Sequence, residues 1–286
     1  MRIGISSPVV VRTPGGFSDW EAGAGIEELA TVAEAADRLG FHHLTCSEHV
    51  AVPRAAAEQR GATYWDPLAT FGYLAARTER IRLATQVLVL GYHHPLEIAK
   101  RYGTLDRVCG GRLVLGVGVG SLEEEFALLD AAYDDRGARA DEAMVALRAS
   151  LAQPEPEHHG EFYDYEGLVV DPCALQERVP MWVGGRTRRS LRRAVELGDG
   201  WVPFGLPLTE LAGLVGSVDV PPGFEVVLST GRLDPLGDPA GTRDRLHRAE
   251  DAGATLAGAA LIADSADHYC DQLARLAEIA GTEEAS

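Results

Sequence analysis

The feature of this sequence that most constrains its fold is a regular alternation of short apolar segments with longer helical ones. Runs rich in Val, Ile and Leu have the length of buried strands, and we predict strands at residues 2–6, 41–46, 81–90, 113–115, 180–183, 200–202, 224–228 and 256–262. Helices are predicted between and after them, at residues 26–39, 67–77, 96–109, 122–129, 138–151, 187–197, 208–215, 240–251 and 266–279. Eight such units in 286 residues match the α/β class and the size of a (β/α)8 TIM barrel.

The same alternation bears on domain organisation. It favours one barrel domain over residues 1–286 rather than two domains. An open, doubly wound sheet is the alternative, because it uses the same strand–helix units. The alternation breaks only between Gln153 and Val179, where several prolines predict an insertion around residues 153–179 as a loop or short hairpin.

Composition narrows the range of partners. The formal net charge of -17 argues against nucleic acid and anionic membrane surfaces. No apolar run is long enough to span a bilayer and no signal peptide is visible, so we expect a cytoplasmic protein. The four cysteines lie far apart, and no His-x-His or His-Glu-x-x-His motif occurs where a metal site would need it, so no metal is expected.

A glycine-rich segment follows the predicted fourth strand. Gly116, Gly118 and Gly120 remove side chains at its carboxyl end, which lets a planar or anionic ligand approach the backbone. Ser121 is predicted to cap the next helix, whose first turn carries three glutamates that suit the helix dipole. The spacing is not the Gly-x-Gly-x-x-Gly dinucleotide fingerprint, which disfavours a Rossmann dehydrogenase. The alternative is a tight connection without a ligand.

Histidine stands directly after the predicted second strand. In a barrel that position faces the catalytic rim, so His49 could move a proton and Glu48 could orient a partner. A purely structural role for His49 is the alternative. His42 and His43 precede it in the same strand, and alternation predicts one inside the barrel and the other facing the helices, both structural.

Five arginines gather between residues 184 and 193 without an acid among them. Backbone N–H groups of Gly185 and Arg186, the Thr187 hydroxyl and the following helix dipole would form a phosphate site. The alternative is a solvated helix face, and we expect Arg189 and Arg193 to lie on the surface.

Together these motifs resemble the luciferase-like monooxygenase superfamily and, within it, the branch of coenzyme F420 (deazaflavin)-dependent oxidoreductases. The resemblance extends over nearly the whole chain and depends on five segments in the family's order, namely residues 47–49, 85–88, 112–120, 180–185 and 198–201. It implies a (β/α)8 barrel that binds F420 or FMN at the carboxyl ends of the strands.

The resemblance also implies roles for individual residues. His49 matches a catalytic histidine beside the reacting carbon, and Gln86-Val87 matches a non-proline cis peptide behind the coenzyme ring. The implied coenzyme contacts are Glu48, Thr85, Gln86, Val87, Gly118, Gly120, Ser121, Gly184, Gly185, Arg186 and Thr187. Deazaflavin-dependent glucose-6-phosphate dehydrogenases have a glutamate at the position of Ser121, which argues against the same substrate and proton-transfer pair.

Three functions follow from this resemblance. The first is an F420-dependent oxidoreductase that transfers a hydride between the coenzyme and an unidentified small organic substrate. The second is an FMN-dependent luciferase-like monooxygenase, which would need a flavin reductase as partner. The third is a non-catalytic barrel that only holds a coenzyme. A homodimer is compatible with all three.

Overall fold

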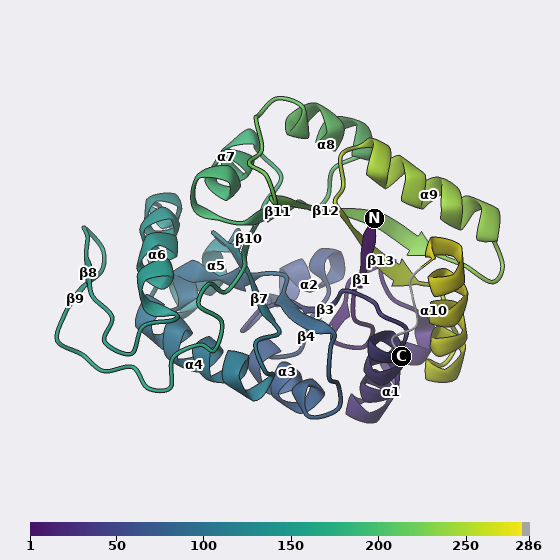
Figure 1. Cartoon of the computed structure of the whole chain (residues 1–286), viewed down its shortest axis with the longest axis horizontal. Helices are drawn as coiled ribbons and strands as arrows, with labels where there is room; N and C mark the ends of the chain where they lie inside the picture. The colour runs from purple at the N-terminus through teal and green to yellow at the C-terminus, as the bar shows by residue number, and fades with distance from the viewer. Residues whose placement is uncertain (282–286) are drawn as a thin grey trace.

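The structure, a computed structural model that describes residues 1–281, is a closed barrel of eight parallel strands surrounded by helices (Figure 1). The barrel strands are β1 (Arg2–Ile5), β3 (His43–Cys46), β5 (Arg82–Thr85), β7 (Leu113–Gly118), β10 (Met181–Gly184), β11 (Gly200–Val202), β12 (Glu225–Leu233) and β13 (Leu256–Leu261). Each pairs with its neighbour in chain order, β10 pairs with β7, and β13 pairs with β1 to close the ring. The predicted TIM barrel is confirmed.

Helices cover the outside of the barrel. They are α1 (Ile26–Arg38), α3 (Pro67–Ala75), α4 (Pro95–Val108), α5 (Glu123–Leu128), α6 (Arg136–Ser150), α7 (Arg188–Leu197), α8 (Leu208–Val215), α9 (Pro239–Asp251) and α10 (Ala266–Ala280). Several of them start at a residue whose side chain caps the helix. Asp66, for example, caps α3 by accepting from the Ala69 N–H, and Pro67 takes the first helical position. None of the helices in residues 1–281 has the length and apolar character needed to cross a bilayer.

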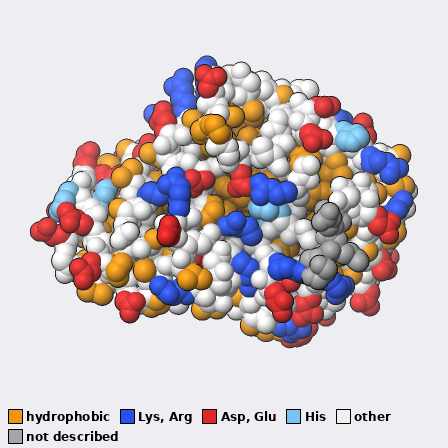
Figure 2. Space-filling view, in the orientation of Figure 1, with side chains coloured by type: hydrophobic (Ala, Val, Ile, Leu, Met, Phe, Trp, Pro, Cys, Tyr) orange, Lys and Arg blue, Asp and Glu red, His pale blue; other side chains and the backbone are white. Residues whose placement is uncertain are grey.

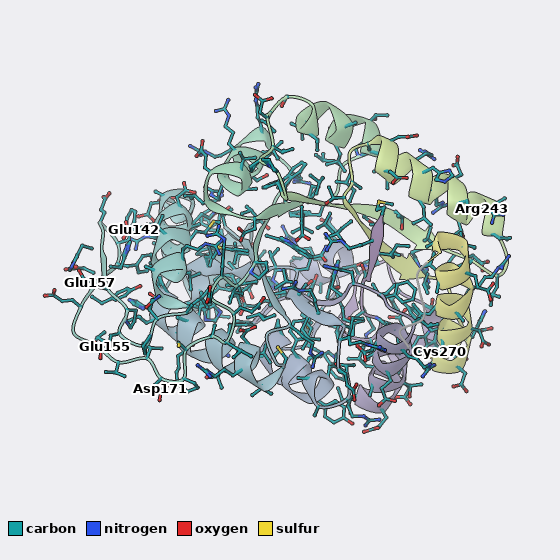
Figure 3. All side chains as sticks on the ribbon, in the orientation of Figure 1. Glu142, Glu155, Glu157, Asp171, Arg243 and Cys270 are labelled. Carbon is teal, nitrogen blue, oxygen red and sulfur yellow. The ribbon has the colours of Figure 1, made fainter. Side chains whose placement is uncertain are left out.

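Smaller elements lie in the loops. They are β2 (Val11–Arg12), the 3-10 helix η1 (Asp19–Ala22), α2 (Arg54–Arg60), β4 (Thr63–Tyr64), β6 (Leu88–Val89), the 3-10 helix η2 (Leu90–Tyr92), β8 (His158–His159) and β9 (Asp164–Tyr165). The predicted insertion contains the β8–β9 hairpin, which extends from the barrel beside α6 in Figure 1. Glu142 of α6 anchors it by accepting from the backbone N–H groups of Phe162 and Tyr163 at 2.9 and 2.7 Å (Figure 3).

Three predicted details were wrong. Residues 81–90 do not form one strand, because the cis peptide bond between Gln86 and Val87 separates β5 from β6. The strand predicted at residues 224–228 continues to Leu233 through a bulge between Ser229 and Arg232. Ser121 does not cap α5, whose N-cap residue is Leu122 and has no side-chain cap.

The amino-terminal end of the barrel is closed by aromatic rings. Both His42 and His43 lie beside Trp182, with ring centroids 6.4 and 5.0 Å from it, so the prediction that one of them faces the helices was wrong. Burial lowers the pKa of His42 to about 3, and Arg2 and Arg82 add to the effect. These histidines are therefore neutral and structural, at the end opposite the predicted site. Elsewhere on the face that Figure 2 shows, acidic and basic side chains are interspersed.

Close approach between β5 and β7 requires glycine at position 116. A Cβ on Gly116 would lie 1.9 Å from the Thr85 carbonyl oxygen, which belongs to the backbone and cannot move aside. We expect Gly116→Ala to lower the free energy of unfolding by about 2–3 kcal/mol, measured by urea denaturation.

The matched control is Gly72→Ala in α3, where an added Cβ meets no atom within 4 Å. Alanine is the better helix former, so this variant should gain up to about 1 kcal/mol. Equal stabilities of the two variants would show that the close approach at Gly116 is unimportant.

Candidate active site

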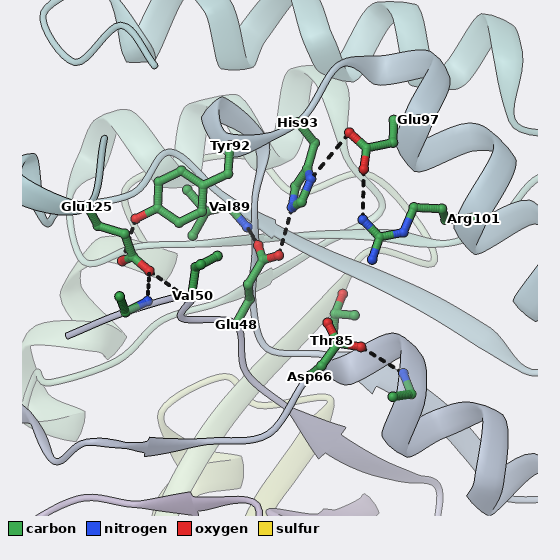
Figure 4. A network of polar contacts seen from close by, with 12 residues as sticks. Glu48, Val50, Asp66, Thr85, Val89, Tyr92, His93, Glu97, Arg101 and Glu125 are labelled. Atoms are coloured by element: carbon green, nitrogen blue, oxygen red, sulfur yellow. Dashed lines mark hydrogen bonds and ion pairs between the residues drawn. The ribbon is translucent and has the colours of Figure 1, made fainter. Parts of the chain in front are cut away.

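The carboxylate of Glu125 is buried at the carboxyl-terminal rim of the barrel. It lies in α5, just after β7, and its side chain is 0% exposed. The His49 Nδ1–H donates to it at 2.7 Å and the Tyr92 hydroxyl donates at 2.7 Å. The backbone N–H groups of Val50 and Ala51 also donate to it, at 2.5 and 3.1 Å (Figure 4). Four donors thus compensate a carboxylate that water does not reach.

These hydrogen bonds determine the protonation states of Glu125 and Tyr92. Burial alone would raise the pKa of Glu125, but hydrogen bonds from Tyr92, His49 and the Ala51 N–H outweigh it and hold that pKa below its usual value. The pKa of Tyr92 is raised by burial and by the same carboxylate. At neutral pH the pair is an ionised Glu125 and a neutral Tyr92 that donates to it.

Glu125 also fixes the orientation of His49. The imidazole packs edge-on against Tyr64, with ring centroids 4.5 Å apart, and is partly exposed. Its Nδ1 is held by Glu125, while its Nε2 has no hydrogen-bond partner among residues 1–281. A histidine held in this way can exchange a proton through Nε2 with a group in the barrel mouth.

Glu48 forms a second carboxylate–histidine pair next to β6. Its carboxylate accepts from the Val89 N–H at 2.8 Å and pairs with His93 Nε2 at 2.7 Å. Figure 4 shows Tyr92, the last residue of the short helix η2, beside Glu125, and His93, the next residue, beside Glu48. Burial lowers the pKa of His93, but the hydrogen bond and charge of Glu48 outweigh it and leave the pKa raised.

The cis peptide lies against the segment after β3 that carries Ser47 and Glu48. The Ser47 hydroxyl donates to the Gln86 carbonyl at 2.5 Å, and the Glu48 N–H donates to the Val87 carbonyl at 3.3 Å. The Val87 side chain fills the space left by two glycines, because a Cβ on Gly118 or Gly184 would lie 2.7 or 2.8 Å from its methyl groups. These glycines therefore have a packing role in the barrel, whatever else they contact.

Three other predicted residues also have structural partners. Thr85 is fully buried and donates through its hydroxyl to the Gly116 carbonyl at 2.7 Å. Gly120 has a φ of +77°, and a Cβ there would lie 2.5 Å from the Phe126 ring. Ser121 accepts from Arg60 Nη1 at 3.3 Å. Their predicted contacts with a coenzyme remain predictions.

The start of α7 is the basic part of the rim. Thr187 caps this helix by accepting from the Ser190 N–H, and Gly185 has a φ of +132°. Arg186 is exposed and forms no ion pair with any described residue. In contrast, Arg193 is 7% exposed and pairs with Asp141 of α6, so its predicted surface position was wrong.

All the predicted site residues thus follow β3, β5, β7 or β10 or end those strands, at one rim of the barrel. Sequence reasoning missed Glu125 and Tyr92. The three glutamates of α5 were all interpreted as groups that favour the helix dipole. Glu125 is in fact buried, together with the next residue, Phe126. Within the described part of the chain, no group of three or more His, Cys, Asp or Glu side chains could hold a metal ion.

Comparison with known proteins identifies the family. The luciferase-like monooxygenase family matches residues 1–219. The chain belongs to this family. An uncharacterised protein of Mycobacterium tuberculosis is 30% identical over 214 residues, which cover 71% of this chain and 74% of that protein.

Proteins similar to this chain include one named as flavin-dependent and one named as coenzyme F420-dependent. The oxygenase component of a flavin-dependent trigonelline monooxygenase from Acinetobacter baylyi is 29% identical over 175 residues, 60% of this chain and 46% of that protein. The coenzyme F420-dependent tetrahydromethanopterin reductase from Methanopyrus kandleri shares the fold, with a TM-score of 0.77, 12% identity and 99% coverage of both chains. Luciferase-like proteins are oxidoreductases, and this chain is of that class.

The Glu48–His93 pair predicts a pH dependence of stability. Because the folded pKa of His93 is raised above 6.5, the pair contributes fully below pH 6.5, and its contribution is lost as the pH rises through the folded pKa. We expect Glu48→Gln to destabilise the protein most at mildly acidic pH and progressively less toward alkaline pH, measured by urea denaturation.

His94 is the internal control in an NMR titration. Burial lowers its pKa, so its ring should titrate below 6.5 and that of His93 above it. In Glu48→Gln the His93 midpoint should fall while the His94 midpoint stays. A His93 midpoint unaffected by Glu48→Gln would contradict the assigned pair.

Proposed function

We propose that this protein is an F420-dependent oxidoreductase that transfers a hydride between the coenzyme and a small organic substrate. The observation that carries the proposal is the His49 imidazole, which a buried carboxylate holds through Nδ1 while Nε2 remains without a partner among the described residues. The related reductase named above for coenzyme F420 supports the choice of coenzyme, since the two chains share one fold over 99% of their length.

The residues at the rim fit a coenzyme with a phosphate. Arg186 lies at the start of α7 without an ion pair to a described residue, and no acid lies in the first turn of that helix. The helix N-terminus and a free guanidinium favour a phosphate. We assign the phosphate to Gly185, Arg186 and Thr187, and the ring to the surface around Gln86, Val87 and Gly118.

Within this site each residue of the chain has a separate task. When bound, the coenzyme supplies or accepts a hydride. His49 Nε2 takes the hydroxyl proton of a substrate that is oxidised, or returns a proton to the oxygen of one that is reduced. Glu125 stabilises the protonated imidazole and fixes its orientation, and is therefore a positioning residue. Tyr92 and two backbone N–H groups keep Glu125 ionised.

An FMN-dependent monooxygenase is the second candidate, because the trigonelline monooxygenase component is named as flavin-dependent. It would require a flavin reductase as partner, and either enzyme could be a homodimer. The third candidate is a barrel that binds a coenzyme without catalysis. Its signature would be coenzyme binding with no hydride exchange on a broad panel of alcohols and enones.

Paired titration of the full chain with F420 and with FMN, followed by tryptophan fluorescence, tests the proposed coenzyme. We expect tighter binding of F420. Tighter binding of FMN by tenfold or more, about 1.4 kcal/mol, would favour the monooxygenase instead.

Variants of the His49–Glu125 pair test the proposed roles. We expect His49→Ala to reduce hydride transfer by roughly 10²–10⁴-fold and to change the dissociation constant of the coenzyme by less than about tenfold. Glu125→Gln should lower kcat and shift the pH profile of kcat, and a mere loss of folded enzyme would not shift that profile. The matched control is His159→Ala in the β8–β9 hairpin, which removes an exposed imidazole and should leave kcat unchanged. Full activity of His49→Ala would contradict the assignment.

A further inference from the structure

A pocket of about 300 Å³, lined by both polar and apolar side chains, opens beside the cis peptide at the same rim. We call it the rim pocket. It lies among the ends of β1, β3, β5, β12 and β13, and the lining residues that matter here are Ser6, Thr45, Ser47, Gln86, Glu21 and Arg232. Ser47 and Gln86 also belong to the candidate active site, so the pocket and the site adjoin. In the ring of strands, β13 and β1 lie opposite β7 and β10, where Gly118 and the proposed phosphate residues are located.

The bulge in β12 determines where Arg232 lies. The register of β12 against β13 shifts between Ser229 and Arg232, and Gly231 within the bulge has a φ of +71°. Such a bulge redirects the side chain that follows it. Arg245 of α9 fixes the backbone by donating to the Arg232 carbonyl at 2.8 Å. Arg232 thereby becomes part of the pocket lining at the end of its strand.

The guanidinium of Arg232 is only partly satisfied. Its Nη2 donates to the Ser18 hydroxyl, whereas its Nε is buried without any hydrogen-bond partner. It forms no ion pair with a residue in the range 1–281. A buried N–H of a charged group without an acceptor costs free energy, and a guanidinium without an ion pair favours an anion in the pocket that it lines.

Other donors line the same pocket. The Gln86 side-chain amide and the Ser6 hydroxyl have no hydrogen-bond partner among the described residues. Glu21 is the acid in the lining, and its carboxylate already accepts from the N–H groups of Val9 and Ser18 at 2.8 and 2.7 Å. The pocket therefore offers unused donors around one positive charge. The nearby Glu21 carboxylate disfavours a doubly charged phosphate relative to a singly charged group.

We propose that the rim pocket binds the organic substrate through a carboxylate, which Arg232 holds while Gln86 and Ser6 donate to its oxygens or to a neighbouring carbonyl. The assignment as substrate pocket rests on the proposed function. It makes the substrate class a small monocarboxylate. Arg232 then determines specificity, and the pocket places the remainder of the substrate beside Gln86 and beside Ser47, which precedes His49 by two residues.

Benzoate and its neutral analogue benzamide are suitable probes, because they differ in the carboxylate and little in size. We expect calorimetric titration of the full chain, with and without bound F420, to show benzoate binding at least about tenfold more tightly than benzamide. Arg232→Gln should abolish this preference. Arg243→Gln is the matched control and should retain the preference, because it removes one positive charge from the exposed surface of α9 and not from the pocket (Figure 3).

Several results would overturn the proposal. The two probes could bind with equal affinity, neither could bind, or Arg232→Gln could retain the preference for benzoate. Bound coenzyme could also exclude benzoate, which would make the pocket part of the coenzyme site. If Arg232→Gln does not fold, Arg232→Lys replaces it as the test variant, because lysine keeps the positive charge but lacks the guanidinium donors. We expect it to weaken the binding of benzoate and to leave the binding of benzamide unchanged. Failure of the proposed function is separate: F420 would not bind, or FMN would bind at least about tenfold more tightly, although the preference for benzoate would persist.

Discussion

Closure of the sheet between β7 and β10 is the constraint on which the rest of the structure depends. It removes both edges of the parallel sheet and brings the carboxyl ends of all eight strands to one rim. Closure also imposes the glycine pattern. Gly116 lies opposite Trp182 in the β7–β10 register and directly against the Thr85 carbonyl, where no side chain fits. Gly116, one of the glycines that first suggested a ligand site, is therefore required for the close approach of β5 and β7.

Burial of two carboxylates at this rim has an energetic cost that the local backbone offsets. Glu48 and Glu125 are each satisfied by a histidine and by backbone N–H groups, and these groups come from the segments that follow β3 and β5. The polar contacts therefore tie three loops together before any ligand binds. A side chain fixed in this way loses little freedom when it acts on a substrate, which is the usual requirement for a catalytic group.

The sequence was sufficient for the barrel because each strand–helix unit carries its own local signals. Length, apolar runs and capping residues such as Asp66 are visible without tertiary information. Glu125 was not identifiable in this way, since three consecutive glutamates look alike until packing buries one of them. The position of Arg193 was predicted wrongly because its partner, Asp141, lies on another helix and their pairing depends on tertiary packing. Arg232 lay beyond the predicted end of its strand, because a bulge does not interrupt the apolar pattern in a recognisable way.

His49 and Arg232 differ in how completely the surrounding residues satisfy their hydrogen-bonding groups. His49 is held by a carboxylate and by an aromatic ring, so its free nitrogen has a defined position. Arg232 is held at one nitrogen and leaves another buried without an acceptor. The first arrangement is complete without a ligand, as expected of a group that only exchanges a proton. The second is incomplete, and an unsatisfied charged donor in a pocket is stabilised by an anion that supplies the missing acceptor. Under the proposed functions of these residues, the same rim would hold a preorganised proton carrier on one side and a substrate-recognition group on the other.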